Sequence, residues 1–205
     1  MKVTIIAGAP NQNPRFLKDN VDKDSYIIAA DSGYLNCEKA GIAPNLIIGD
    51  FDSSEKPDIS CEIIQLPVIK NDTDTFYCIK EAVKRGADEV EVFCALGGRT
   101  DHSLSNILSL EYLLKNNIKA SIISEKCSLS LHNRGFSINK GNFRFFSLFA
   151  LGGAVKGLCI KGAEYELDDY TLSPFASIGQ SNEFKNSTVN IDFADGVILL
   201  ILSND

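Results

Sequence analysis

The chain has 205 residues, of which 44% are hydrophobic and 23% charged, so it can bury one large core or two modest ones. Its net charge of -7 and the absence of any Lys/Arg block argue against nucleic acid as a partner. No apolar run approaches the roughly 20 residues of a membrane helix, and the N-terminus lacks a signal-peptide pattern. We therefore expect a cytoplasmic protein without a membrane partner.

Up to about residue 124, short apolar runs alternate with helical patterns. The expected strands are Val3–Ala7, Tyr26–Ala30, Leu46–Ile48, Glu62–Leu66, Val90–Leu96 and Ala120–Ser124. Thr75–Arg85 and His102–Lys115 have apolar residues at helical spacing, and Gly86 is placed to end the first helix. This alternation predicts an α/β N-terminal domain, residues 1–125, with a mostly parallel, Rossmann-like sheet and helices on both faces.

After about residue 126 the helical signal stops. Apolar runs separated by Gly, Asn, Asp and Pro turns follow at intervals of roughly ten residues, a spacing typical of an antiparallel sandwich or barrel. The expected strands are Arg144–Leu151, Leu158–Leu167, Ser187–Phe193 and Val197–Leu202. We predict an all-β sandwich C-terminal domain, residues 126–205.

The six cysteines are scattered, without a C-x-x-C pair, and most lie in apolar runs such as Val92–Leu96. This distribution favours buried, reduced thiols over disulfides or metal ligands.

Acidic side chains follow two of the predicted strands. Asp50 and Asp52 come directly after Leu46–Ile48, and their i, i+2 spacing places both carboxylates on one side of an extended chain. Asp31 follows Tyr26–Ala30 and is succeeded by Ser32 and Gly33. Taken alone, each group is as easily an Asp turn or a helix N-cap. At the carboxyl ends of parallel strands, however, converging carboxylates would need a cation between them.

Two further polar groups lie at predicted helix starts. Asn71-Asp72-Thr73-Asp74 opens the first helix, where Thr73 or Asp74 could also cap it. Gly97-Gly98-Arg99-Thr100-Asp101-His102 opens the second, with glycines that let backbone N–H groups approach an anion and an arginine fork for phosphate oxygens. Asn106 shares the helix face of His102, whereas His132 receives no role. Together the four groups predict a magnesium–nucleotide site.

The order of these motifs resembles the thiamine pyrophosphokinase family. The resemblance continues through Ser147–Leu151, Val155–Leu158 and Gly179–Phe184, and it spans about residues 5 to 202. It implies transfer of the pyrophosphoryl group of ATP to thiamine, giving thiamine diphosphate and AMP. It also implies a homodimer, with thiamine between the N-terminal domain of one subunit and the sandwich of the other.

The resemblance assigns roles by motif position. It places Mg²⁺ on Asp50, Asp52 and an acid of the Asn71–Asp74 segment, for which we choose Asp74. We expect Asp52, Asp74 and Arg99 to act in catalysis, with Asp74 or Asp52 as the general base. The nucleotide would be bound by Asp31, Asp72, Thr73, Arg99, Asp101, His102 and Asn106, and the thiamine pyrimidine by Ser181 and Asn182.

The chain departs from the family pattern at two points. Asn71 stands where many members have an acid, so Asp72 or Asp74 would have to compensate. The chain also lacks the Trp that some members stack on thiamine, and Tyr165, Phe175 or Phe184 could supply an aromatic face instead.

Two other classes of protein remain open from the residues. A strand ending in Asp-x-Asp also resembles the nucleophile loop of haloacid-dehalogenase-type phosphatases, but that chemistry needs a later lysine, and Lys70 is poorly placed for it. A non-catalytic module that binds a metal or nucleotide is the other alternative.

Overall fold

The computed structural model describes residues 1–51 and 60–204, which form two compact units, Met1–Glu125 and Lys126–Asp205. Asp52, a predicted metal ligand and catalytic residue, lies outside the described residues.

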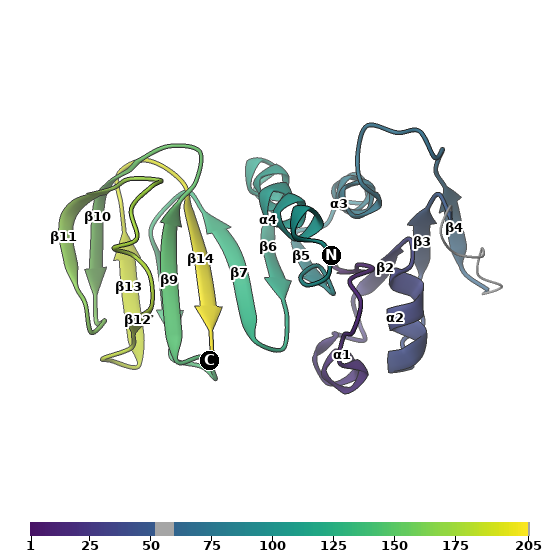
Figure 1. Cartoon of the computed structure of the whole chain (residues 1–205), viewed down its shortest axis with the longest axis horizontal. Helices are drawn as coiled ribbons and strands as arrows, with labels where there is room; N and C mark the ends of the chain where they lie inside the picture. Colours follow the sequence, from purple (N-terminus) through teal and green to yellow (C-terminus); the bar gives the residue numbers. More distant parts are fainter. Residues whose placement is uncertain (52–59, 205) are drawn as a thin grey trace. The chain divides into compact units, whose positions relative to one another are not determined.

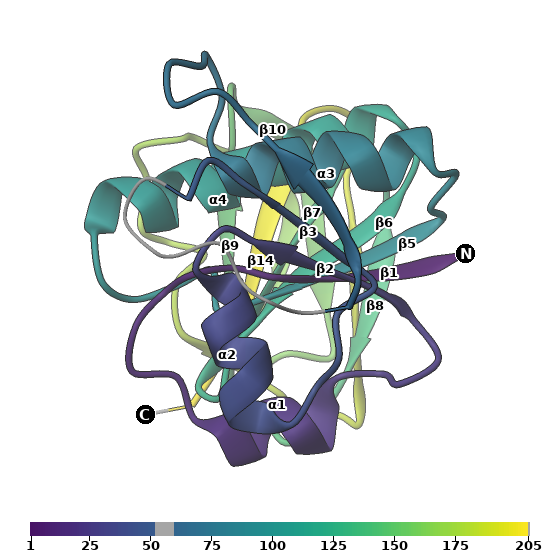
Figure 2. The same cartoon turned by 90° about the vertical axis from the view of Figure 1, so that its right-hand side faces the viewer.

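The first unit is built on a parallel sheet with the strand order β6-β5-β1-β2-β3-β4. The strands are β1 (Lys2–Ile6), β2 (Tyr26–Ala30), β3 (Leu46–Gly49), β4 (Glu62–Gln65), β5 (Glu89–Phe93) and β6 (Lys119–Ile123). The helices are α1 (Pro14–Asn20), α2 (Gly33–Ala40), α3 (Asp74–Lys84) and α4 (Thr100–Lys115). α1 and α2 cover one face of this sheet, and α3 and α4 cover the other (Figures 1 and 2). The predicted α/β unit with a mostly parallel sheet is confirmed.

Both predicted helices of this unit form, and α3 ends as expected. Arg85 is its C-cap, and the N–H of Gly86, with φ +79°, donates to the carbonyl of Val83 at 3.0 Å. The sequence did not predict α1 and α2. Each has eight residues or fewer, which is too short to show a clear apolar period, and α2 begins at Gly33 and is followed by Gly41.

The face under α1 and α2 carries its own apolar cluster. Leu17 of α1 and Cys37 of α2 pack with Ile6, Ala29 and Ile47 from the strands, and all five are buried. Alternate strand residues, such as Ile5, are buried on the other face of the sheet. A sheet buried on both faces fixes the positions of its strand ends, where the acidic residues lie.

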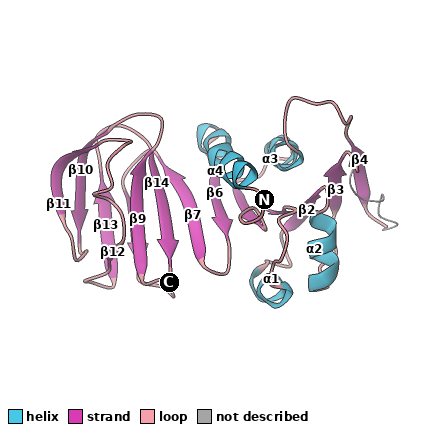
Figure 3. Ribbon diagram, viewed as in Figure 1, coloured by secondary structure: helices cyan, strands magenta, loops and turns pink. Residues whose placement is uncertain are grey.

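The second unit consists of strands only among residues 126–204 (Figure 3). β7 (Cys127–His132), β9 (Phe145–Ala150), β12 (Asn182–Glu183) and β14 (Ile198–Ser203) form one antiparallel group in the order β12-β9-β14-β7. β8 (Phe136–Asn139), β10 (Val155–Lys161), β11 (Leu167–Leu172) and β13 (Thr188–Asp192) form a second antiparallel sheet in the order β11-β10-β13-β8.

One predicted strand of this unit is wrong. Leu158–Leu167 is divided between β10 and β11 by a turn at Gly162. Gly162 has φ +89°, and its N–H donates to the Glu166 carboxylate at 2.7 Å. A Cβ at this position would meet the Thr188 carbonyl oxygen at 2.6 Å, so only glycine fits the turn without a shift.

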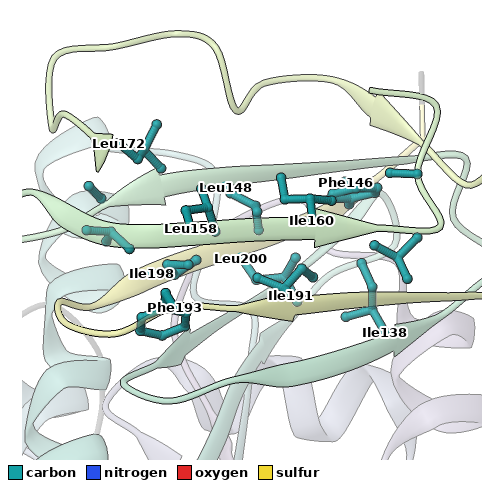
Figure 4. Packing of buried hydrophobic residues seen from close by; sticks show 14 of the residues in the cluster. Ile138, Phe146, Leu148, Leu158, Ile160, Leu172, Ile191, Phe193, Ile198 and Leu200 are labelled. Atoms are coloured by element: carbon teal, nitrogen blue, oxygen red, sulfur yellow. The ribbon is translucent and has the colours of Figure 1, made fainter. Parts of the chain in front are cut away.

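The two antiparallel sheets share one apolar core (Figure 4). Phe146 and Leu148 of β9 pack in the same cluster as Leu158 and Ile160 of β10, and all four are at most 1% exposed. Each Å² of apolar surface that these side chains remove from water stabilises the folded unit by about 25 cal/mol. The unit is therefore stabilised without a disulfide. No disulfide joins the six cysteines, as predicted, but the predicted burial holds only for Cys37, Cys78 and Cys94, whereas the other three are partly exposed.

His132 of β7 makes the stability of this unit sensitive to acid. Its ring stacks on Phe136 with centroids 3.7 Å apart, and Nε2 lies 2.9 Å from Ser130 Oγ. Burial lowers the pKa of His132 from 6.5 to about 4. The neutral ring is therefore favoured in the folded state, and its contribution to stability is complete above pH 6.5 and is lost as pH falls toward 4.

We expect acidification from pH 7 to 5 to remove about 2 kcal/mol of stability through His132, since protonation favours the unfolded chain. His132→Gln, which cannot be protonated, should lose less. The measurement is the melting temperature of both proteins at the two pH values. Equal decreases would contradict the burial of a neutral His132.

None of the helices in the described residues combines the length and apolarity needed to cross a membrane.

Candidate functional site

A cavity of about 600 Å³ opens at the carboxyl ends of β1, β2 and β5. Its walls come from the loop after β1, the turn after β2, the first turn of α3 and the segment that joins β5 to α4. The lining residues are Ala7–Pro10, Ala30–Ser32, Thr73–Thr75, Cys94, Ala95, Gly97–Arg99, His102 and Asn106. The volume suits a small-molecule ligand, and the strand-end location is the usual one in open α/β sheets.

Asp31 lies in this cavity in a conformation that its neighbours impose. It has φ +45°, a region that few non-glycine residues adopt, and its N–H donates to the Ile48 carbonyl at 2.7 Å. A Cβ on Gly49 would come within 2.8 Å of Asp31 Cα, so glycine at the end of β3 makes room for this carboxylate. Asp31 Oδ1 is buried and has no hydrogen-bond partner among the described residues. A buried, unsatisfied carboxylate oxygen is an energetic cost that a bound cation would relieve.

Asp50 and Asp74 are joined by a lysine that the sequence did not assign to the site. Lys70 Nζ donates to Asp50 Oδ2 and lies 3.0 Å from Asp74 Oδ1. The contact with Asp74 lacks hydrogen-bond geometry, so we treat it as an ion pair only. The described structure thus brings Asp50 and Asp74 together around one ammonium group.

The pKa values of Asp74 and Lys70 reflect this arrangement. Burial raises the pKa of Asp74; Lys70 opposes the shift, and the charges of Asp50 and Asp31 add to it. Burial alone would lower the pKa of Lys70, but Asp50 and Asp74 raise it overall. Asp31 and Asp50 therefore lie near enough to Asp74 for their charges to affect its ionisation.

Thr73 and Asp72 take different positions at the start of α3. Thr73 is the N-cap, and its hydroxyl accepts a hydrogen bond from the Phe76 N–H at 3.2 Å, so the predicted capping arrangement is present in a residue that also lines the cavity. Asp72 is not among the lining residues of the described structure, and its carboxylate accepts from Lys80 Nζ at 2.5 Å. Its predicted role in nucleotide binding stays a prediction.

The glycine-rich segment after β5 adopts the conformation that its sequence indicates. Gly97 and Gly98 have φ +95° and +68°. Arg99 follows, and its guanidinium donates to both carboxylate oxygens of Asp101, at 3.1 and 2.6 Å. Both side chains are exposed, so the pair can open at little cost when an anion offers Arg99 a better partner. His102 is an exposed residue on the cavity wall.

Two buried asparagines hold the cavity loops. Asn106 Nδ2 donates to the Ala95 carbonyl at 2.8 Å, so this residue, predicted to bind nucleotide, also fixes the segment after β5. Asn36 of α2 donates to the carbonyls of Ala7 and Ala9 at 3.0 and 3.2 Å.

Sequence reasoning missed the loop after β1 altogether. Ala7–Pro10 contains no charged side chain, and its contribution to the cavity is mostly backbone. The available signal was a strand that ends in the small residues Ala7, Gly8 and Ala9. A Cβ on Gly8 would lie 2.3 Å from Ser32 Oγ, so the loop after β1 and the turn after β2 fit closely together.

We expect Asn36→Asp to destabilise the fold by about 3 kcal/mol and to weaken nucleotide binding, because a buried carboxylate would face two carbonyl oxygens without a donor. Thermal unfolding and the KM for ATP measure the two effects. Asn116→Asp is the matched control: Asn116 Nδ2 also donates to a backbone carbonyl, that of Tyr112, but on the surface. Similar losses in both variants would contradict a special role for Asn36.

The residues predicted to bind thiamine lie in the second unit. Ser181 is exposed with φ +55°, and its N–H donates to Ser147 Oγ at 3.0 Å. Asn182 is 5% exposed, and its amide exchanges hydrogen bonds with the N–H and carbonyl of Tyr165 at 3.0 and 2.7 Å. Asn182 therefore fixes the position of Tyr165.

Among the three aromatic candidates, Tyr165 and Phe175 are 68% and 98% exposed. Phe184 belongs to the core and packs edge-on against Phe146, with centroids 5.3 Å apart. It has no free face for a ligand, so this candidate was wrong.

The described residues alone do not complete a metal site. No three His, Cys, Asp or Glu side chains within 1–51 and 60–204 form such a group. The oxygen donors of Asp31, Asp50 and Asp74 nevertheless suit Mg²⁺, and the unsatisfied Asp31 oxygen fits a nearby cation.

Comparison with known proteins identifies relatives of both units. Residues 17–122 match the thiamin pyrophosphokinase catalytic domain, and residues 136–198 match the thiamin pyrophosphokinase vitamin B1 binding domain. The thiamine pyrophosphokinase of Bacillus subtilis (strain 168) is 29% identical over 213 residues, which cover 99% of each chain.

Solved structures agree with these matches. The crystal structure of thiamine pyrophosphokinase from Bacillus subtilis has a TM-score of 0.92 and 26% identity and covers all of both chains. A thiamin pyrophosphokinase family protein from Enterococcus faecalis has a TM-score of 0.84 and 25% identity, also over the whole of both chains. The catalytic-domain match alone spans more than half of the chain. The chain therefore belongs to the thiamin pyrophosphokinase family.

Proposed function

We propose that the protein is a thiamine pyrophosphokinase, which transfers the pyrophosphoryl group of ATP to thiamine and releases thiamine diphosphate and AMP. The observation that carries this proposal is the match of both family domains, in order, to the two units of one chain. The strand-end cavity of the first unit adds a place for the nucleotide.

The cavity has several groups that suit a triphosphate. The N–H groups of the Gly97–Gly98 segment and the N-terminus of α4 favour negative charge. Arg99 can exchange its contact with Asp101 for phosphate oxygens, and His102 lies one helical position beyond that acid. Ser32, at the N-cap of α2, makes no side-chain capping bond and also lines the cavity.

Mg²⁺ would be held by Asp50, Asp74 and Asp52, the last of which lies outside the described residues. When bound, it would neutralise charge on the phosphate oxygens. Asn71 is exposed, and the Asp72 carboxylate pairs with Lys80. Asp74 lines the cavity, so it is better placed than Asp72 to bind the metal.

In the proposed reaction the thiamine hydroxyl oxygen attacks the β-phosphorus, and the bond from this phosphorus to the α,β-bridging oxygen breaks. AMP leaves with the bridging oxygen, and the hydroxyl proton passes to Asp74 or Asp52. Burial raises the pKa of Asp74, which makes its carboxylate a stronger proton acceptor. Arg99 would stabilise the charge on the transferred group.

For the second unit we propose a sandwich of its two antiparallel sheets, since these share one core. Ser181 and Asn182, with exposed Tyr165 or Phe175, would bind thiamine. We further propose a homodimer, supported by the family resemblance, and a cytoplasmic location, supported by six cysteines that no disulfide joins.

The test is incubation of purified protein with ATP, Mg²⁺ and thiamine, followed by chromatographic quantification of all products. The proposal predicts equal amounts of thiamine diphosphate and AMP, and neither without thiamine. Phosphate release without thiamine would indicate a phosphohydrolase, and no turnover of ATP would indicate a non-catalytic module.

A further inference from the structure

Lys70 carries a positive charge in the place where the proposed function requires a metal ion. Its side chain is 8% exposed and that of Asp50 is 9% exposed, although Lys and Asp are rarely buried to this degree unless they are paired. The ammonium group contacts Asp50 Oδ2 and lies 3.0 Å from Asp74 Oδ1. These two carboxylates are the proposed metal ligands within the described residues.

Within residues 1–51 and 60–204, Lys70 contacts two of the three carboxylates at this rim, Asp50 and Asp74. Burial and the charges of Asp50 and Asp31 raise the pKa of Asp74, and Asp31 Oδ1 is buried without a hydrogen-bond partner among the described residues. The single charge of one ammonium group equals the charge of one carboxylate, so Lys70 by itself does not match the charge of all three. The arrangement therefore lets the protein fold without metal while it retains an attraction for a divalent cation.

We propose that Lys70 is a built-in cation that holds Asp50 and Asp74 together in the metal-free protein and that gives up these contacts when a divalent metal binds. The inference rests on the proposed function for the identity of the metal ligands. Lys70 then acts as a competitor of the metal and as a positioning residue.

The exchange follows from charge and geometry. An ammonium group and a divalent ion compete for the same carboxylate oxygens, because their positive charges repel each other at close range. The lysine side chain has a flexible four-carbon stem and can move its charge several ångströms without a backbone change. Phosphate oxygens of a nucleotide would offer the displaced ammonium a new partner. Competition by Lys70 should accordingly make the free metal bind weakly and the metal–nucleotide complex bind well.

The test is titration of the protein with Mn²⁺ alone, with free Mn²⁺ followed by electron paramagnetic resonance. Lys70→Met removes the competing charge and should tighten Mn²⁺ binding about tenfold. Lys80→Met is the matched control, because Lys80 Nζ also pairs with an aspartate, Asp72 at 2.5 Å, which is not one of the proposed metal ligands. It should leave the Mn²⁺ dissociation constant within twofold of wild type.

Thermal unfolding supplies a second readout. Without metal, Lys70→Met should melt below wild type, since the carboxylates repel one another, and Mn²⁺ should raise its melting temperature more than that of wild type. If Lys70→Met folds only with Mn²⁺, that result also supports the proposal, and Lys70→Gln, which keeps an N–H donor, allows the affinity to be measured.

The proposal is overturned if both Lys70 variants bind Mn²⁺ no more tightly than wild type, or more weakly. These measurements need neither ATP nor thiamine. A protein that shows the tenfold change but makes no thiamine diphosphate would contradict the proposed function and leave the role of Lys70 standing.

Discussion

Asp74→Asn is expected to lower kcat about a thousandfold while the protein stays folded, within the range for loss of a general base. Asp74 lines the cavity, begins α3 and contacts Lys70. Asparagine has nearly the same shape as aspartate, but it neither accepts a proton nor offers a charged ligand to the metal.

The stability of Asp74→Asn, unlike its kcat, should not fall below that of wild type. Burial, together with Asp50 and Asp31, raises the pKa of Asp74, so the ionised carboxylate destabilises the fold at pH values above its ordinary pKa of 3.8. Asparagine removes this cost, and Lys70 keeps its bond to Asp50. The melting temperature at pH 7 without metal should therefore equal or exceed that of wild type, which would separate loss of chemistry from loss of fold.

Asp72→Asn is the control for this variant, because Asp72 lies two residues earlier and pairs with Lys80. We expect less than a threefold change in kcat. Comparable losses from the two substitutions would refute the distinction that the structure makes between these acids, and near-normal turnover of Asp74→Asn would remove Asp74 from the mechanism.

Gly33→Ala is expected to lower the free energy of unfolding by about 3 kcal/mol, which is at the upper end of the range for overpacking. This loss corresponds to a decrease of roughly 10 °C in the melting temperature. A Cβ at Gly33 would lie 2.1 Å from the Ile6 carbonyl oxygen and 3.0 Å from its carbon. Both atoms belong to the backbone of β1, so no side chain can move aside. The start of α2 would have to shift away from β1.

That shift should also impair nucleotide binding. Gly33 follows Asp31 and Ser32 directly, and both line the cavity. Thermal unfolding and the KM for ATP measure the two effects together. Gly153→Ala is the control, since its Cβ would meet nothing within 4 Å. An unchanged melting temperature for Gly33→Ala would show that the close approach of β1 and α2 is not required.

The location of the acidic residues could be predicted from the sequence because it depends on local patterns. Asp31 and Asp50 each follow an apolar strand, and the carboxyl ends of parallel strands meet at one edge of the sheet. Thr73 and Gly86 mark the ends of α3 through the preferences of capping residues, which act within a few positions along the chain.

The remaining features depend on contacts between distant parts of the chain. Lys70 bonds to Asp50, twenty residues away, and no periodicity connects them. Ala7–Pro10 lines the cavity through its backbone, which leaves little trace in residue type. Gly162 ends a strand because the Thr188 carbonyl lies against it, so the predicted Leu158–Leu167 strand could be rejected only from the fold.

A crystal structure of the protein with Mn²⁺ and a non-hydrolysable ATP analogue would test the central claim most directly, because anomalous scattering locates the ion. We predict one Mn²⁺ in contact with the carboxylates of Asp50 and Asp74, with the triphosphate beside Gly97, Gly98 and Arg99. An ion bound away from both aspartates, or a nucleotide outside the cavity that these strand ends form, would contradict the account.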